Sequence, residues 1–282
     1  MNELPLHIKK AINRYKEVTI DGLTLYPIKV SAYEEFLQAR PALEFMQQSL
    51  PIEYMSMPIL QAFFSLDFGA ALNGKMPTGL FSSALLGLGL SLRLVEEPDD
   101  PTDIIKRFTV ITDKADPTRL KYIETVINGM EQVRITPIQY AKVREIIAAQ
   151  NGVDIPDTDD NPELVQAERD LAEQNAPRLD ATIPDMVISV AALENTDEDD
   201  IYEWAIMKLN KRLEHHQRVL EYLVCGIGSA SGATWKGGNP CPNPWFRKLE
   251  SGSSALMRIE EFAGGQGIAA IQNPSREVPS IP

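Results

Sequence analysis

His215, His216, Cys225 and Cys241 are the residues of this chain best suited to metal chemistry. A zinc site needs side chains that converge on one point, and zinc-binding cysteines commonly occur as closely spaced pairs. Adjacent histidines on a helix diverge by about 100°, and the two cysteines are not spaced as such a pair. The spacing therefore assigns no metal ligands, no catalytic residues and no cofactor.

His216 belongs to an apolar stripe on a long helix predicted over residues 197 to about 224, with Thr196 as its N-cap. The stripe consists of Ile201, Ala205, Leu209, Leu213, His216, Leu220 and Leu223. A histidine can act as an acid or base near neutral pH, but only with a placed partner. The stripe favours a histidine that packs beside the core and makes one hydrogen bond.

A second face of the same predicted helix is basic and aromatic. Its members are Trp204, Lys208, Lys211, His215, Arg218 and Tyr222. Residues 151–200, just upstream, hold 15 acidic side chains and 2 basic ones. The basic face is open to three interpretations: it is solvated, it binds an acidic partner, or it takes up the chain's own acidic segment 154–200.

The segment 235–246 combines prolines with three aromatic residues, Trp235, Trp245 and Phe246. Closely spaced prolines favour an extended backbone with few internal hydrogen bonds, so aromatic side chains would have to anchor the segment. One interpretation packs the tryptophans against the end of the long helix, near Leu220 and Leu223. The other interpretation makes the aromatic residues a partner-binding surface.

Charge argues against nucleic acid as a partner, residue spacing argues against a calcium-binding loop, and hydropathy argues against a membrane span. The net charge of −13 argues against nucleic acid, which is bound by an excess of Lys and Arg. The acidic loop at 154–163 lacks the glycine that a calcium-binding EF-hand needs at its sixth position. The most apolar run, residues 79–95, is shorter than the ~20 residues of a membrane span, so it predicts a buried helix.

The hydropathy pattern predicts a mainly α protein with small β elements, of the α+β class. The β elements are a hairpin around Asp21-Gly22 and a meander of short strands near 108–111, 121–126 and 133–135. Prolines 41, 51 and 58 are expected to divide the first helical region, after a capping box from Ser31 to Glu34. Thr78 is expected to cap the buried helix, Thr136-Pro137 to begin another, and Pro162 and Pro184 to begin two more.

The expected organisation is an N-terminal hairpin and helical domain (1–95), a meander and helix (96–152), an acidic segment with the long helix and the proline- and aromatic-rich segment (153–248), and a C-terminal helix with a flexible tail (249–282).

Five segments together resemble proteins encoded in tailed-bacteriophage and prophage genomes of Gram-positive bacteria. They are 23–30 (LTLYPIKV), 33–36 (YEEF), 143–152 (VREIIAAQNG), 201–204 (IYEW) and 237–245 (GGNPCPNPW). The resemblance implies a tail-morphogenesis factor, with an assembly chaperone as the inferred role and other phage tail proteins as its partners.

The expected function is therefore a non-enzymatic protein-binding factor, located in the cytoplasm of the bacterial host or in the virion. A structural tail or connector component and a hydrolase or metal enzyme remain as alternatives. The partner-binding residues would be the basic face and the three aromatic residues of 235–246. The oligomeric state is left open.

Overall fold

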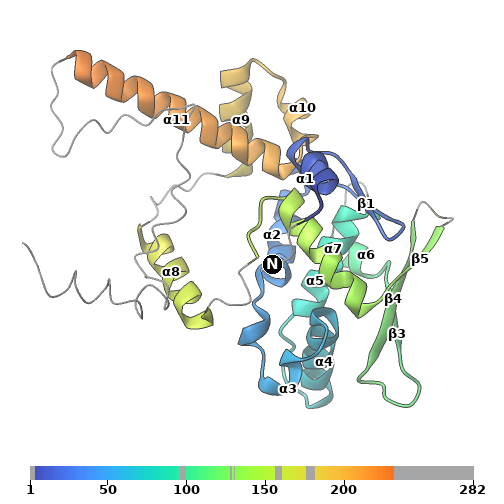
Figure 1. The fold of residues 1–282 in the computed structure, drawn as a ribbon. Coiled ribbons are helices and arrows are strands. Elements are labelled where there is room, and N and C mark those ends of the chain that lie inside the picture. The colour runs from blue at the N-terminus through green and yellow to red at the C-terminus, as the bar shows by residue number, and fades with distance from the viewer. Residues whose placement is uncertain are drawn as a thin grey trace, which may run out of the picture. The chain divides into compact units, whose positions relative to one another are not determined.

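The computed structural model describes residues 4–95, 100–127, 129, 131–155, 161–175 and 182–231. The chain is mainly α-helical with two small antiparallel sheets, as predicted (Figure 1). It divides into two compact units, Met1–Gln217 and Arg218–Pro282, and each is described by itself.

The N-terminal elements are α1 (Leu6–Asn13), β1 (Val18–Ile20), β2 (Leu23–Leu25), η1 (Val30–Ala32), α2 (Tyr33–Glu44), η2 (Gln47–Ser49), α3 (Ile52–Met55), α4 (Ile59–Leu72) and α5 (Leu80–Ser91). They are followed by α6 (Pro101–Ile105), β3 (Thr109–Thr112), β4 (Leu120–Ile127), β5 (Glu131–Ile135) and α7 (Pro137–Gln150). The last described elements are α8 (Pro162–Asn175), α9 (Ile183–Glu194), α10 (Glu198–Tyr202) and α11 (Ile206–Ala230).

Several elements follow the local signals that predict them. Asp21 and Gly22 both have positive φ, 48° and 82°, as a two-residue hairpin turn requires, and Ile20 pairs with Leu23. Strands β3, β4 and β5 form the predicted meander in that order. Thr136 and Gln139 make a reciprocal capping box at the start of α7. The second strand of the hairpin is short, because β2 ends at Leu25.

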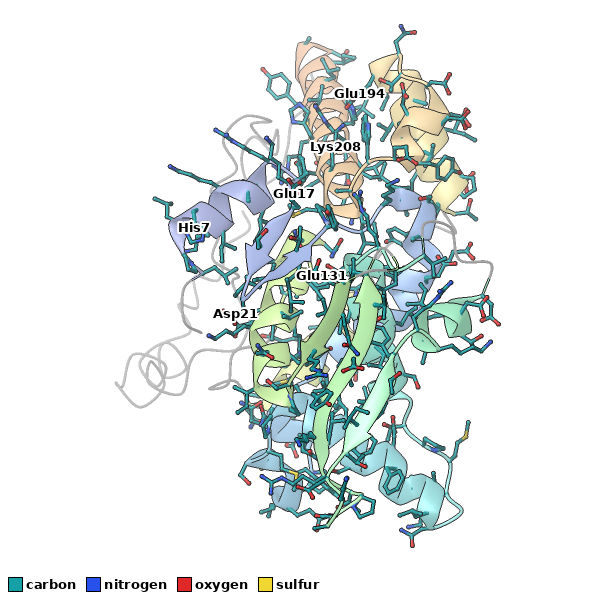
Figure 2. All side chains as sticks on the ribbon, turned by 90° about the vertical axis from the view of Figure 1, so that its right-hand side faces the viewer. His7, Glu17, Asp21, Glu131, Glu194 and Lys208 are labelled. Atoms are coloured by element: carbon teal, nitrogen blue, oxygen red, sulfur yellow. The ribbon has the colours of Figure 1, made fainter. Side chains whose placement is uncertain are left out.

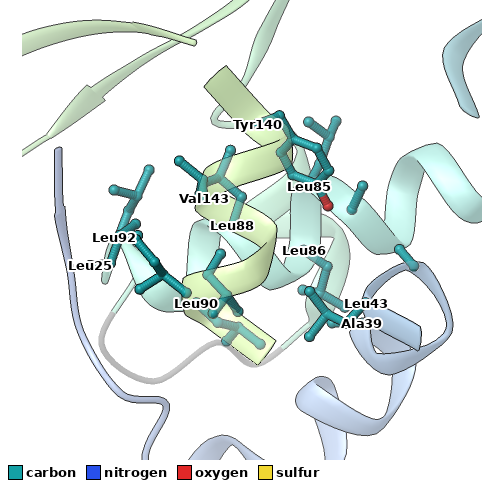
Figure 3. Packing of buried hydrophobic residues seen from close by; sticks show 14 of the residues in the cluster. Leu25, Ala39, Leu43, Leu85, Leu86, Leu88, Leu90, Leu92, Tyr140 and Val143 are labelled. Carbon is teal, nitrogen blue, oxygen red and sulfur yellow. The ribbon is translucent and has the colours of Figure 1, made fainter. Parts of the chain in front are cut away.

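Helix α5 lies at the centre of the main core and is buried on all sides over residues 84–91. Figure 3 shows its leucines between side chains of α2, including Ala39, and side chains of α7, including Tyr140. Glycines allow this close approach: a Cβ at Gly87 would lie 3.3 Å from Cβ of Ala39. A Cβ at Gly89 would overlap Cγ2 of Ile104, so α6 can pack there only against glycine.

Arg144 of α7 fixes the end of α2. Its guanidinium is buried, and it donates hydrogen bonds to the carbonyl oxygens of Ala42 at 3.0 Å, Leu43 at 2.7 Å and Phe45. A cation at this position complements the negative end of the helix dipole and satisfies carbonyls that have no helical partner. Burial lowers the pKa of Arg144, and the nearby Tyr140 and Glu145 oppose that shift.

Two local predictions around α2 are wrong. Ser31 does not cap α2, whose N-cap is Ala32 with no side-chain hydrogen bond. Pro41 lies inside α2, because Ala39, Ala42 and Leu43 pack into the core and outweigh the lost backbone hydrogen bond.

The start of α5 is capped from a distance. The carboxylate of Asp67, on α4, accepts hydrogen bonds from the backbone amides of Thr78 at 2.7 Å and Phe81 at 3.0 Å, and from the Thr78 hydroxyl. The N-cap residue is Gly79, so the predicted cap by Thr78 is replaced by a contact between two helices. The helix ends at Ser91 rather than near Val95.

The predicted long helix over 197–224 is also wrong in its first part, because α10 and α11 are separate. Between them, the Val30 amide donates to the Trp204 carbonyl at 2.8 Å, and the Ile206 amide donates to the Ile28 carbonyl at 3.0 Å. These bonds form a short β-bridge that a continuous helix could not make. The cap of α10 is Asp197 rather than Thr196.

Buried apolar residues form two clusters. The main core contains residues from both 1–95 and 96–152, together with Ile206 and Met207 at the start of α11. The second cluster is smaller and joins η1, α9, α10 and α11 through Val30, Val187, Val190, Ala191, Ile201 and Leu209. The first turns of α11 are therefore held by both clusters.

We expect Gly89→Ala to lower the free energy of unfolding by about 1–3 kcal/mol, because the new methyl group overlaps the Ile104 side chain. Gly69→Ala in α4 is the matched control: no atom lies within 4 Å of its added Cβ, so it should raise stability by about 0.5–1 kcal/mol. Urea unfolding of both variants measures the difference. Equal stabilisation by both would show that α5 is not closely packed at Gly89.

Candidate functional site

The predicted basic face is partly assembled around aromatic rings. Trp204 precedes α11 instead of lying on it, and Nζ of Lys208 lies 3.3 Å from the centroid of its ring. Burial is the main cause that lowers the pKa of Lys208, with nearby Arg212 adding to the effect. Nζ of Lys211 lies 5.7 Å from the Tyr15 ring centroid. The described contacts of both lysines are thus cation–π contacts within the chain.

The remaining predicted partner-binding residues are placed as follows. His215 lies on α11 with its ring centroid 6.1 Å from that of His216. Arg218 and Tyr222 follow on the same helix, and Tyr222 is exposed. Trp235, Trp245 and Phe246 lie outside the described residues. Of the predicted set, the structure brings Trp204 and Lys208 into contact.

One acidic residue joins α9 to α11. Oε1 of Glu194 lies 2.9 Å from Nε2 of His216 and 3.5 Å from Nε of Arg212. Figure 2 shows Glu194 on α9 and Lys208 in the first part of α11. His216 is half-buried with this hydrogen bond, as the stripe predicts. The acidic segment thus meets α11 at Arg212 and His216, while apolar residues of the second cluster make the rest of the contact.

An open groove of about 720 Å³ lies between the start of α4, the β3–β4 turn and the start of α7. Gln61 fixes one wall, since it accepts a hydrogen bond from the Leu120 amide at 2.7 Å and donates to the Thr118 carbonyl at 3.0 Å. The rim carries two aspartates, Asp113 and Asp116, beside Arg119 and Lys121. Because the rim carries two acidic and two basic side chains, its net charge favours neither an anionic nor a cationic ligand.

Two further observations concern the described part of the chain. In these ranges no group of three or more His, Cys, Asp or Glu side chains is placed to hold a metal ion. Within the same residues, no helix has the length and apolar character needed to cross a membrane. Residues 156–160 of the predicted acidic loop at 154–163 lie outside the described residues.

The most distinctive surface is an apolar strip on the second half of α11, which we call the distal face. It consists of Val219, Leu220, Leu223, Val224 and Ile227. Leu220 and Leu223 are 50% and 51% exposed, and Val224 and Ile227 are 65% and 67% exposed. Leu209, on the same side of the helix about two turns before His216, is fully buried.

Exposure differs between the two halves of the apolar stripe. The sequence shows apolar residues continuing at helical spacing from Leu209 to Ile227, but it does not show which of them are buried. In the first unit, α9 ends at Glu194 beside His216. Burying the exposed part of one such aliphatic side chain is worth about 1 kcal/mol, so the uncovered strip can stabilise a complex.

The chain was compared with protein-family models, curated proteins and solved structures, and none of them matched it.

We expect Arg212→Glu to loosen α9, because it places a second carboxylate next to Glu194. The pair is partly exposed, so amide hydrogen exchange in α9 should quicken only about two- to fivefold. Lys211→Glu makes the same charge change at the neighbouring position, where the lysine faces Tyr15. Faster α9 exchange in Lys211→Glu than in Arg212→Glu would contradict the assigned contact.

Proposed function

We propose that this chain is a non-enzymatic protein-binding factor of bacteriophage tail morphogenesis, acting as an assembly chaperone. The observation that carries protein binding is the distal face, an exposed strip of aliphatic side chains on one side of a helix. The phage assignment is supported by the five segments that resemble phage and prophage proteins. Its partners would be other tail proteins in the cytoplasm of the bacterial host.

The distal face has the composition of a binding surface rather than of ordinary solvent-facing helix. A helix that faces water normally carries polar residues on its outer side. Here Leu220, Leu223 and Ile227 recur on one side, so their apolar areas join into one strip. Contiguous exposed apolar strips mark interaction sites because covering them removes apolar surface from water.

The net charge of −13 fits a factor that must keep an apolar surface in solution. Like charges on separate copies repel, which opposes association through the exposed strip. A chaperone needs this combination, because it has to present apolar residues to a client without aggregating. The same charge favours clients that are neutral or basic.

The test is affinity purification of the tagged chain from phage-producing cells, followed by mass spectrometry. We expect tail proteins to co-purify with the parent chain. Changing Leu220 and Leu223 to lysine should reduce their recovery by about tenfold or more, since a buried charge replaces apolar contact. Lysine is a good helix former, so α11 should stay folded.

The matched control is Ile188→Lys with Leu193→Lys on α9. These side chains are 50% and 51% exposed, which equals the exposure of Leu220 and Leu223, and the chemical change is the same. Recovery of tail proteins should stay at the parental level with this control. Equal loss in both double variants, or the absence of tail proteins from the parental sample, would refute the proposal.

A further inference from the structure

We propose that the distal face binds one amphipathic helix of a partner protein, and that this helix carries an apolar stripe with uncharged edges. This inference rests on the proposed function and adds the structural class of the partner segment. It follows from the spacing of the distal residues, from the residues beside them, and from the net charge of the chain.

The distal residues have the spacing of a helix-packing seam, which is a row of side chains that faces a second helix. Leu220, Leu223 and Ile227 are separated by three and then four residues. The same alternation runs upstream through Leu209, Leu213 and His216 on the same helix. Alternating intervals of three and four residues keep side chains facing a second helix at a shallow crossing angle. An extended partner strand would instead present side chains at intervals of two.

The edges of the seam are uncharged. Val219 and Gly226 lie along one edge, and Gln217 and Val224 lie along the other. In helix seams these positions usually carry charges that select the partner. Here a charged partner edge would be buried against Val224 or Val219 without a counter-charge, which is costly. The partner stripe should therefore also have uncharged edges.

Gly226 adds a steric feature at the edge of the seam. A Cβ at this position would meet no atom of the described residues within 4 Å, so packing among those residues does not require glycine here. Its missing side chain leaves space for the backbone of a neighbouring helix to approach. A partner helix with a large side chain opposite Gly226 would fill that space.

The charge of the chain favours a partner segment over a second copy of this chain. Residues 217–230 of α11 extend about 21 Å at 1.5 Å per residue, which is roughly four turns and sets the length of the partner helix. Two copies that each carry a net charge of −13 repel one another. A neutral or basic partner helix does not meet this repulsion.

The test uses a designed peptide of about 14 residues, held helical by a side-chain staple on its solvent face. It has leucines at alternating three- and four-residue spacing, alanines beside them and lysines on the outer face. A control peptide has the same composition and staple, with the leucines distributed around the helix. Fluorescence anisotropy measures binding of each labelled peptide to the full chain.

The designed peptide should bind about tenfold or more tightly than the control peptide. Leu220→Lys with Leu223→Lys should weaken its binding by a similar factor, and Ile188→Lys with Leu193→Lys should leave it within about twofold. Equal binding of the two peptides, or binding that ignores the distal substitutions, overturns the inference. In that case, tail proteins that co-purify with the parent chain but not with the Leu220→Lys, Leu223→Lys variant would leave the proposed function standing. Only the assignment of a helix as the partner segment would then be wrong.

Sedimentation and the same peptide-binding assay distinguish two other occupants of the distal face. If the full chain sediments as a dimer that Leu223→Lys dissociates, the face belongs to a second copy and the inference is wrong. If replacing Trp235, Trp245 and Phe246 by alanine raises the peptide affinity about tenfold, the chain's own C-terminal residues occupy the face. An unchanged affinity together with a monomeric chain supports the partner helix.

Discussion

The burial of α5 on every side is the constraint on which the first unit depends. A helix can be enclosed in this way only if its neighbours approach closely, and Gly87 and Gly89 allow α2 and α6 to do so. Arg144 then ties the end of α2 to α7 through buried hydrogen bonds. The helices around α5 are thus fixed by packing and by polar contacts that a change at one of these positions would disturb.

This rigid packing determines where α11 begins and which of its residues are covered. Ile206 and Met207 belong to the main core, and the β-bridge between residues 28–30 and 204–206 fixes the backbone just before the helix. Helix α9 then covers the next turns through the second cluster and Glu194. In Arg218–Pro282 the apolar spacing of the helix continues, and the described leucines there are exposed, with Leu223 at 51%. Function is proposed for these exposed residues.

Local signals in the sequence predict the elements whose geometry is set by neighbouring residues. Asp21-Gly22 forms a hairpin because both residues tolerate positive φ. Thr136 caps α7 because the Gln139 side chain accepts a hydrogen bond from the Thr136 amide in return. Two of the failures depend on contacts between separate elements: Asp67 caps α5 from α4, and Ile28 and Val30 interrupt the expected long helix. The distal face shows the same limit, since periodicity gives its residues but not their exposure.

The central claim is that the distal face contacts another protein in the cell, and photo-crosslinking tests it most directly. A photoreactive phenylalanine analogue is placed at position 223 in the chain produced in phage-infected cells, and at position 193 in a control chain of equal side-chain exposure. The account predicts a crosslink from position 223 to a different polypeptide, mapped to a helical segment, and little product from position 193. Crosslinks from position 223 that reach only this chain itself, or equal products from both positions, would contradict it.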